Sequence, residues 1–197
     1  MRAIIFDFDG VIHDTLEDLH RIHCQTLEEL TMDEMKENVF GGNSREYFDK
    51  FSDEEKDNFE KIWKTHCNDL RLERAIRDEL EILSQSYLLF IVSSNNEYNL
   101  NRYFENNNFL NIFTKIYGAE THKSKYEKFK ILLGNFDLIV DECIFVTDTL
   151  GDILEANKIG LKTIAVDFGY HERERLEKGN PIKIVSHFKE IGKFIES

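Results

Sequence analysis

Short apolar runs alternate with helical patterns along the carboxyl-terminal part of the chain. Runs rich in β-branched and aromatic residues cover residues 87–92, 113–118, 143–147, 161–166 and 182–185, and a similar run at 3–6 precedes them. Helical patterns at 97–107, 125–134, 152–159 and 171–178 separate most of these runs. Strands that alternate with helices predict right-handed crossovers and a parallel sheet covered by helices on both faces. The predicted core is therefore a doubly wound, Rossmann-like α/β sheet.

Residues 14–78 have a different pattern, rich in charge and without a convincing strand. Side chains spaced three or four residues apart predict one buried helix face; they are Leu16, Leu19, His23, Leu27 and Leu30. Ser52 followed by Glu55 has the spacing of a capping box at the start of another helix. We therefore expect a small all-helical cap at residues 14–78, inserted after the first strand, and an α/β core made of residues 1–13 and 79–197.

Charge and cysteine content limit the location and the partners of the chain. Its 25 Lys and Arg against 38 Asp and Glu give a net charge of −13. Nucleic acids and anionic membranes bind positive surfaces, so we expect neither as a partner. There is no signal-peptide pattern and no apolar run near the roughly 20 residues of a membrane helix. Three cysteines without a CxxC pair favour free thiols in a reducing cytosol. We expect a cytoplasmic monomer or homodimer.

Polar side chains follow three of the predicted strands at the point where each strand ends. They are Asp7 and Asp9 after residues 3–6, Ser93 and Ser94 after residues 87–92, and Asp148 after residues 143–147. Ligands of parallel sheets bind beyond the carboxyl ends of the strands, so we expect these side chains to share one site. Strand alternation turns Phe8 away from that site, toward packing beneath the loop.

A lysine is expected at the same edge of the sheet. Lys125 lies in the first turn of the predicted helix at 125–134, and Ser124 with Glu127 has the spacing of a second capping box. The positive helix N-terminus disfavours a cation there unless an anion lies between the lysine and the backbone donors. Carboxylates with open positions suit Mg²⁺, and Ser and Lys suit the oxygens of a phosphoryl group. Cys and His are missing from this set, so zinc is not expected.

Four motifs occur in a fixed order along the chain: Asp7-Phe8-Asp9-Gly10-Val11, then Ser93, then Lys125, then Asp148 with Asp152. In this order they resemble the four motifs of the haloacid dehalogenase superfamily. The helical insertion after the first motif resembles the helical cap of that family, and the tail DFGYHERERLEKGNPIKIVSHFKEI resembles its phosphoglycolate-phosphatase-like members. The resemblance spans most of the chain. It implies a Mg²⁺-dependent phosphatase that hydrolyses a small phosphorylated metabolite.

The resemblance also implies a role for each matching residue. Asp7 matches the nucleophile that becomes an aspartyl-phosphate, and Asp9 matches the acid that protonates the leaving oxygen and then deprotonates water. The Mg²⁺ ligands would be Asp7, the backbone carbonyl of Asp9, and Asp148. The phosphate-binding residues would be Ser93, Ser94 and Lys125. Asp152 matches a residue that orients the metal shell.

Several alternatives stay open at this point. A phosphotransferase of the β-phosphoglucomutase type shares every core residue, and a non-catalytic metal- or phosphate-binding module would keep the same fold. Lys123 is the alternative to Lys125 as the phosphate-binding lysine. The segment FGGNSREYF at residues 40–48 is expected to face the site, with Arg45 as the candidate for a substrate carboxylate or second phosphate.

Overall fold

The computed structural model describes residues 1–41 and 44–196, and of Ser44 and Arg45 it describes the backbone. Its centre is a sheet of six strands that all run parallel, in the order β3-β2-β1-β4-β5-β6. The strands are β1 Ala3–Phe6, β2 Leu88–Val92, β3 Lys115–Tyr117, β4 Cys143–Thr147, β5 Lys162–Val166 and β6 Lys183–Val185. This is the doubly wound, Rossmann-like order, so the predicted fold class is confirmed.

The central strand β1 lies between β2 and β4, where the order of connection along the sheet reverses. Phe6 pairs with Ile91 of β2 and with Val146 of β4, so the three strands end at nearly the same level. Ligands of open α/β sheets bind at such a reversal, beyond the carboxyl ends of the strands. The polar residues that follow β1, β2 and β4 are therefore delivered to one place.

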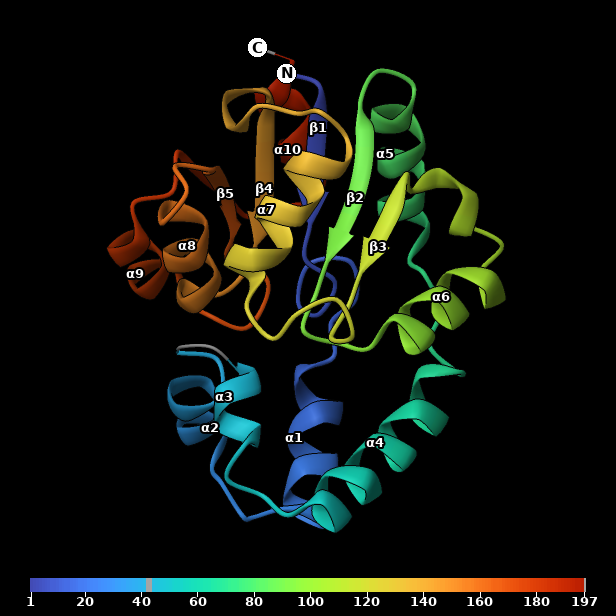
Figure 1. The fold of residues 1–197 in the computed structure, drawn as a ribbon, viewed down its shortest axis with the longest axis vertical. Coiled ribbons are helices and arrows are strands. Elements are labelled where there is room, and N and C mark those ends of the chain that lie inside the picture. The colour runs from blue at the N-terminus through green and yellow to red at the C-terminus, as the bar shows by residue number, and fades with distance from the viewer. Residues whose placement is uncertain (42–43, 197) are drawn as a thin grey trace.

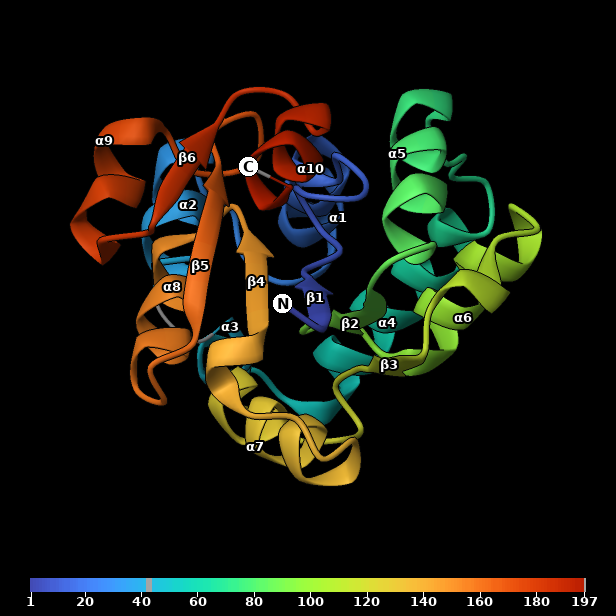
Figure 2. The ribbon, with the colours of Figure 1, turned by 90° about the horizontal axis from the view of Figure 1, so that it is seen from above.

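Helices cover both faces of the sheet (Figure 2). They are α5 Arg74–Ser84, α6 Glu97–Asn106, α7 Lys125–Asn135, α8 Leu150–Asn157, α9 Arg173–Leu176 and α10 Lys189–Ile195. Alternation along β1 divides the core in two. Ile4 and Phe6 pack with side chains of α5, α6 and α10, whereas Ala3 and Ile5 pack with α7 and α8. All six predicted strands form; the central strands β1 and β4 are buried along their whole length, whereas the edge strand β6 is buried only at Val185.

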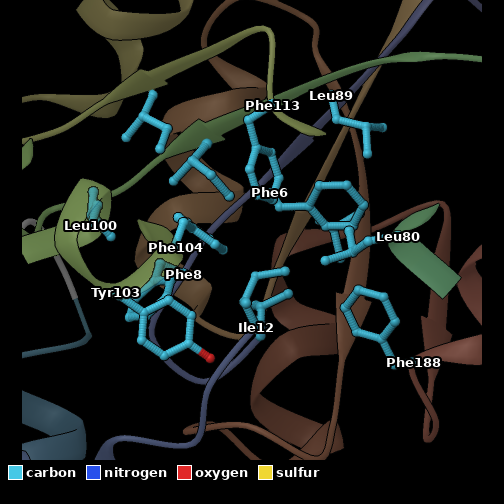
Figure 3. Packing of buried hydrophobic residues seen from close by; sticks show 14 of the residues in the cluster. Phe6, Phe8, Ile12, Leu80, Leu89, Leu100, Tyr103, Phe104, Phe113 and Phe188 are labelled. Carbon is cyan, nitrogen blue, oxygen red and sulfur yellow. The ribbon is translucent and has the colours of Figure 1, made fainter. Parts of the chain in front are cut away.

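Phe8 continues the first of these clusters beneath the loop after β1. It is 1% exposed. Its ring makes edge contacts with Tyr103 at 4.8 Å and with Phe104 at 5.8 Å between ring centroids (Figure 3). The prediction that Phe8 packs away from the site is confirmed. The packing fixes the loop between Asp7 and Asp9 to the core.

Four helices lie beyond the carboxyl edge of the sheet (Figure 1). They are α1 Leu16–Thr26, α2 Met32–Asn38, α3 Ser44–Phe48 and α4 Asp53–Cys67. The capping box predicted for α4 is confirmed: the Glu55 N–H donates to Ser52 Oγ at 3.3 Å, and the Ser52 N–H donates to the Glu55 carboxylate at 2.9 Å. This all-helical group follows the first strand, as predicted, and we call it the cap.

Three details differ from the prediction. The first helix ends at Thr26, so Leu27 and Leu30 of its predicted face lie beyond it. The segment at 40–48, expected as a loop, contains α3 in its second half. The predicted cap boundary after residue 78 falls inside α5, which packs on α10 and β2 of the core; we propose that the cap ends before α5, in residues 68–73.

None of the helices among the described residues is long and apolar enough to cross a membrane.

Candidate active site

Asp7 follows β1 and is 5% exposed. Its Oδ1 accepts the N–H of Phe8 at 2.7 Å, and its Oδ2 accepts from the Lys125 ammonium at 2.6 Å. Burial raises the pKa of Asp7 well above its usual range, and the Lys125 charge opposes that rise. The carboxylate thus has a cation beside it, although burial still favours its protonated form.

Asp9 lies on the cavity side of the same loop. Its Oδ1 accepts from the Thr15 hydroxyl at 2.8 Å, and its Oδ2 accepts from the Asn95 amide at 3.5 Å. Burial raises the pKa of Asp9 to about 6, while the bond from Thr15 and the charge of Lys125 act in the opposite direction. A carboxyl group with a pKa near neutrality can give and take a proton at physiological pH.

Asp148 follows β4 and is fully buried. Its Oδ2 accepts the N–H of Tyr170 at 2.7 Å, whereas its buried Oδ1 has no hydrogen-bond partner among the described residues. Burial raises the pKa of Asp148 to about 8. The loop after β1 approaches it closely: Gly10 has φ +76°, and a Cβ at that position would lie 1.8 Å from Asp148 Oδ2.

These carboxylates fit a hard divalent cation. A buried carboxylate oxygen without a partner costs free energy, and a cation would satisfy it. No set of three or more His, Cys, Asp and Glu side chains within the described part of the chain has the arrangement of a metal site. The predicted Mg²⁺ set is smaller, with two carboxylates and one backbone carbonyl. Few protein ligands suit Mg²⁺, which keeps several waters.

Lys125 holds two of the acidic motifs together. Its ammonium lies 2.6 Å from Asp7 Oδ2 and 2.6 Å from Asp152 Oδ2, and Asp152 also accepts from the Thr147 hydroxyl at 2.9 Å. Burial would lower the pKa of Lys125, but Asp152 and Asp7 together raise it above its usual value. The side chain of Asp152 thus contacts Lys125, Thr147 and Asp7 directly. Its predicted role in the metal shell stays a prediction.

The alternative lysine lies on the surface. The ammonium of Lys123 is 2.7 Å from both carboxylate oxygens of Asp49 in the cap, and both side chains are more than half exposed. Lys125, 3% exposed, is the lysine that reaches Asp7.

The capping box predicted at Ser124 is wrong. Ser124 occupies the N-cap position of α7, but its side chain makes no capping bond there. Glu155 of α8 takes this place: its carboxylate accepts the N–H of Lys125 at 2.5 Å and the N–H of Tyr126 at 3.1 Å. The anion expected beside this helix N-terminus is thus supplied by the protein itself. Glu127 instead bonds to Lys130 at 3.0 Å.

Ser93 and Ser94 follow β2 and line the same cavity as Asp7. Ser93 is buried, and its hydroxyl accepts the N–H of Asn95 at 3.0 Å. Sequence reasoning missed Lys128, a fully buried lysine whose ammonium donates to the Ser93 carbonyl at 2.5 Å. Its spacing of three residues from Lys125 places both on one helix face, which is the signal that was available.

The cap closes over this edge of the sheet and leaves a cavity of about 130 Å³. Asp7, Asp9, Lys125 and Asp152 line its floor, and side chains of α1, α2, α3 and α4 line its other side. Phe48 of α3 and Phe40, which lies between α2 and α3, are part of this lining, so both described ends of the segment at 40–48 face the site. The side chain of Arg45 lies outside the described part of the chain, and its predicted role stays a prediction.

Several bonds join the cap to the core around the cavity. The Trp63 indole donates to the Asn95 side chain at 3.3 Å. The His171 ring accepts the N–H of Leu150 at 3.0 Å and donates to the Lys36 carbonyl of the cap at 3.0 Å. Tyr170, which bonds to Asp148 through its backbone, also packs its ring against Phe40. The site is therefore closed from the cap side by specific contacts.

Comparison with known proteins identifies the family. Residues 4–166 match the family model described as haloacid dehalogenase-like hydrolase. The chain belongs to this family. Haloacid dehalogenase-like hydrolases are enzymes, so the resemblance of the four motifs is confirmed at the level of the family. The match includes the loops after β1, β2 and β4 and the start of α7, which carry the candidate residues.

Individual relatives agree with this membership. A phosphoglycolate phosphatase of Aquifex aeolicus is 27% identical, and the alignment covers 86% of each chain. A haloacid dehalogenase-like hydrolase from Streptococcus pneumoniae superimposes with a TM-score of 0.83 at 23% identity, covering 99% of this chain and 98% of that one. A predicted phosphoglycolate phosphatase from Haemophilus somnus 129pt gives 0.80 at 19% identity, with the same coverage. The two structures share the fold of this chain.

Proposed function

We propose that this protein is a Mg²⁺-dependent phosphomonoesterase that transfers the phosphoryl group of a small metabolite to Asp7 and then to water. One observation carries the proposal. Asp7, a buried carboxylate at the cavity floor, lies 2.6 Å from the Lys125 ammonium. A second carboxylate, Asp148, follows the neighbouring strand, and one of its oxygens has no hydrogen-bond partner within the described part of the chain. A nucleophile, a cation and an unsatisfied oxygen ligand are what phosphoryl transfer to an aspartate requires.

In the first step an Asp7 oxygen attacks phosphorus, and the bond from phosphorus to the leaving oxygen breaks. Asp9 gives its proton to that oxygen, so the product leaves as an alcohol. The pKa of about 6 at Asp9 suits this role, because the group is partly protonated near neutral pH. Thr15 and Asn95 hold the two carboxyl oxygens of Asp9 in place.

In the second step water attacks the phosphorus of the aspartyl-phosphate, and Asp9 takes the proton from that water. The bond between phosphorus and the Asp7 oxygen breaks, which releases phosphate and restores the carboxylate. Lys125 stays beside the reacting oxygens, and Asp152 with Thr147 fixes its position. Ser93 and Ser94 line the same cavity as Asp7, and in this proposal their hydroxyls would donate to phosphoryl oxygens.

Mg²⁺ would be held by Asp7, Asp148 and the Asp9 backbone carbonyl, where it offsets the negative charge of the phosphoryl group. The pKa shifts of the protein alone support a cation at this place. Burial favours protonated forms of both Asp7 and Asp148, whereas a nucleophilic carboxylate must be ionised. A divalent charge beside the pair would lower both pKa values.

The named relative supports a small phosphorylated substrate, since it is a phosphoglycolate phosphatase. Three free cysteines are consistent with the cytoplasmic location that we propose. We propose neither nucleic acid nor a membrane as a partner, because the net charge of −13 disfavours both.

The proposal is tested with a panel of phosphate monoesters, assayed for released phosphate with Mg²⁺ and with a chelator. We expect phosphate release that needs Mg²⁺ and falls by several orders of magnitude in Asp7→Asn. Asp141→Asn is the matched control, because Asp141 precedes β4, at the end of the strand opposite Asp148, and its side chain is 77% exposed. Activity that survives chelation or Asp7→Asn would contradict the mechanism.

A further inference from the structure

We infer that the leaving group of the substrate carries an aromatic ring or a similarly apolar body, which the cap holds by contact. This inference rests on the proposed phosphatase function and adds the substrate class. The inferred leaving group differs from glycolate, which is a short carboxylate. Glycolate is the leaving group that the name of the Aquifex aeolicus relative, phosphoglycolate phosphatase, implies.

The two sides of the cavity differ in chemistry. The floor carries the carboxylates, serines and lysine described above, where the phosphoryl group would lie. The cap side is lined mostly by apolar and aromatic side chains; they include Leu19, Met35, Phe40, Phe48, Phe59 and Trp63. A group attached to a phosphate on the floor would extend into this apolar part. Burial of an apolar leaving group there is favourable, and burial of a charged one is costly.

The polar atoms of the larger rings are already bonded. The Trp63 N–H donates to Asn95 Oδ1, which also accepts from the Asn99 side chain at 3.2 Å. The Tyr170 hydroxyl bonds to the Thr15 hydroxyl, and its ring lies 4.6 Å from the Phe40 ring between centroids. These residues therefore present ring faces and edges to a ligand, which suit stacking or edge contact with another ring.

The two lysines among the described residues that line the cavity are both in ion pairs. Lysines 56 and 125 are the cations among the lining residues that the structure describes. The ammonium of Lys125 is bound to Asp7 and Asp152, and that of Lys56 lies 3.0 Å from Asp53. Among the described lining residues, apolar contact is therefore the main interaction open to the leaving group.

Trp63 provides a test that needs no turnover, because it is the single tryptophan of the chain and lines the cavity. Its fluorescence is titrated, in the presence of Mg²⁺, with three phosphonates of similar reach: phenylethylphosphonate, propylphosphonate and phosphonopropionate. We expect a Kd for the phenylethyl compound about tenfold lower than for the propyl compound. The carboxylate compound should bind most weakly.

Variants of lining residues test whether the preference for the phenylethyl compound comes from the cavity. Phe48→Leu and Phe59→Leu each remove a ring but keep an apolar side chain, so the ratio of the propyl Kd to the phenylethyl Kd should fall toward one. Tyr98→Leu removes an exposed ring on α6 outside the lining and should leave the ratio unchanged. The ratio is measured within each variant, so a partly unfolded fraction affects both ligands alike.

Two results would overturn the inference: a ratio near one in the natural protein, or tightest binding by phosphonopropionate. An unchanged ratio in both phenylalanine variants would equally overturn it. Phosphate release from benzyl phosphate and ethyl phosphate is measured in parallel. If the phosphonates bind as expected but neither ester is hydrolysed, the proposed function fails while the apolar binding site stands. If both esters are hydrolysed without preference and the binding ratio is near one, the function stands and the inference fails.

Discussion

Replacement of Lys125 by methionine should destabilise the protein strongly. The Lys125 ammonium lies 2.6 Å from carboxylate oxygens of Asp7 and Asp152, and the exposed fractions of the three side chains are 4%, 7% and 15%. Methionine keeps much of the length of the side chain but removes the charge. The two buried acidic side chains, which also hydrogen-bond to each other, would then lack the cation that both now contact.

The magnitude follows from this burial. Removal of one partner from a buried ion pair costs about 3–5 kcal/mol, because an uncompensated charge is left in the protein. For a chain of this size each kcal/mol lowers Tm by about 2–4 °C, so we expect a loss of about 6–20 °C without Mg²⁺. The measurement is thermal and urea unfolding followed by circular dichroism.

Two further variants show whether the charge is the cause. Lys123→Met removes an exposed ion pair to Asp49 on the same segment and should cost at most about 1 kcal/mol. Adding Asp152→Asn to Lys125→Met should restore part of the stability, with a coupling free energy of about 0.5–3 kcal/mol. Equal losses for the two lysine variants, or strictly additive losses in the double variant, would refute the reasoning.

Three other outcomes are expected. Gly10→Ala should lower the free energy of unfolding by about 1–3 kcal/mol and weaken activation by Mg²⁺, because φ is +76° and a Cβ would meet Asp148. Urea unfolding measures the first effect, and a Mg²⁺ titration of the activity measures the second. Glu155→Gln should cost about 1 kcal/mol in urea unfolding, because the anion at the N-terminus of α7 is lost; unchanged stability would contradict that role. Burial lowers the pKa of His171 below 6.5, so the unfolded chain binds this proton first as the pH falls. The stability that neutral His171 contributes is fully present above pH 6.5 and is lost as the pH falls below it. The free energy of unfolding should therefore change less with pH in His171→Gln, and an unchanged pH dependence would count against this assignment.

The sheet and its polar edge could be predicted because their signals are local. A strand buried on both faces is a short apolar run, and the first polar residue after it marks where the strand ends. Asp7 after β1, Ser93 after β2 and Asp148 after β4 each carried that signal. The parallel topology then brought them together without any knowledge of side-chain contacts.

Contacts between distant segments could not be predicted in this way. Ser52 and Ser124 have the same capping-box spacing, but only Ser52 forms the box. At Ser124 the carboxylate of Glu155, 31 residues away, occupies the helix N-terminus instead. From the sequence alone, Lys128 is expected to be a surface charge. In the structure its helix packs on β2, and its ammonium donates to the Ser93 carbonyl. Tertiary packing decides both outcomes.

The same limit applies to the cap. Its helices could be predicted from spacing, but the apolar lining of the cavity depends on how α1, α2 and α4 are placed over the sheet. The hydrogen bond from the His171 ring to the Lys36 carbonyl joins residues 135 positions apart, and no sequence pattern in either segment predicts it.

Covalent phosphorylation of Asp7 is the central claim, and a rapid acid quench tests it most directly. The protein is mixed with a hydrolysed phosphate ester and Mg²⁺, quenched within one turnover and digested, and its peptides are analysed by mass spectrometry. We predict one added phosphoryl group on the amino-terminal peptide that contains Asp7, absent in Asp7→Asn and absent without Mg²⁺. Phosphate release during the first turnover with no phosphorylated peptide, or a phosphoryl group on another residue, would contradict the account.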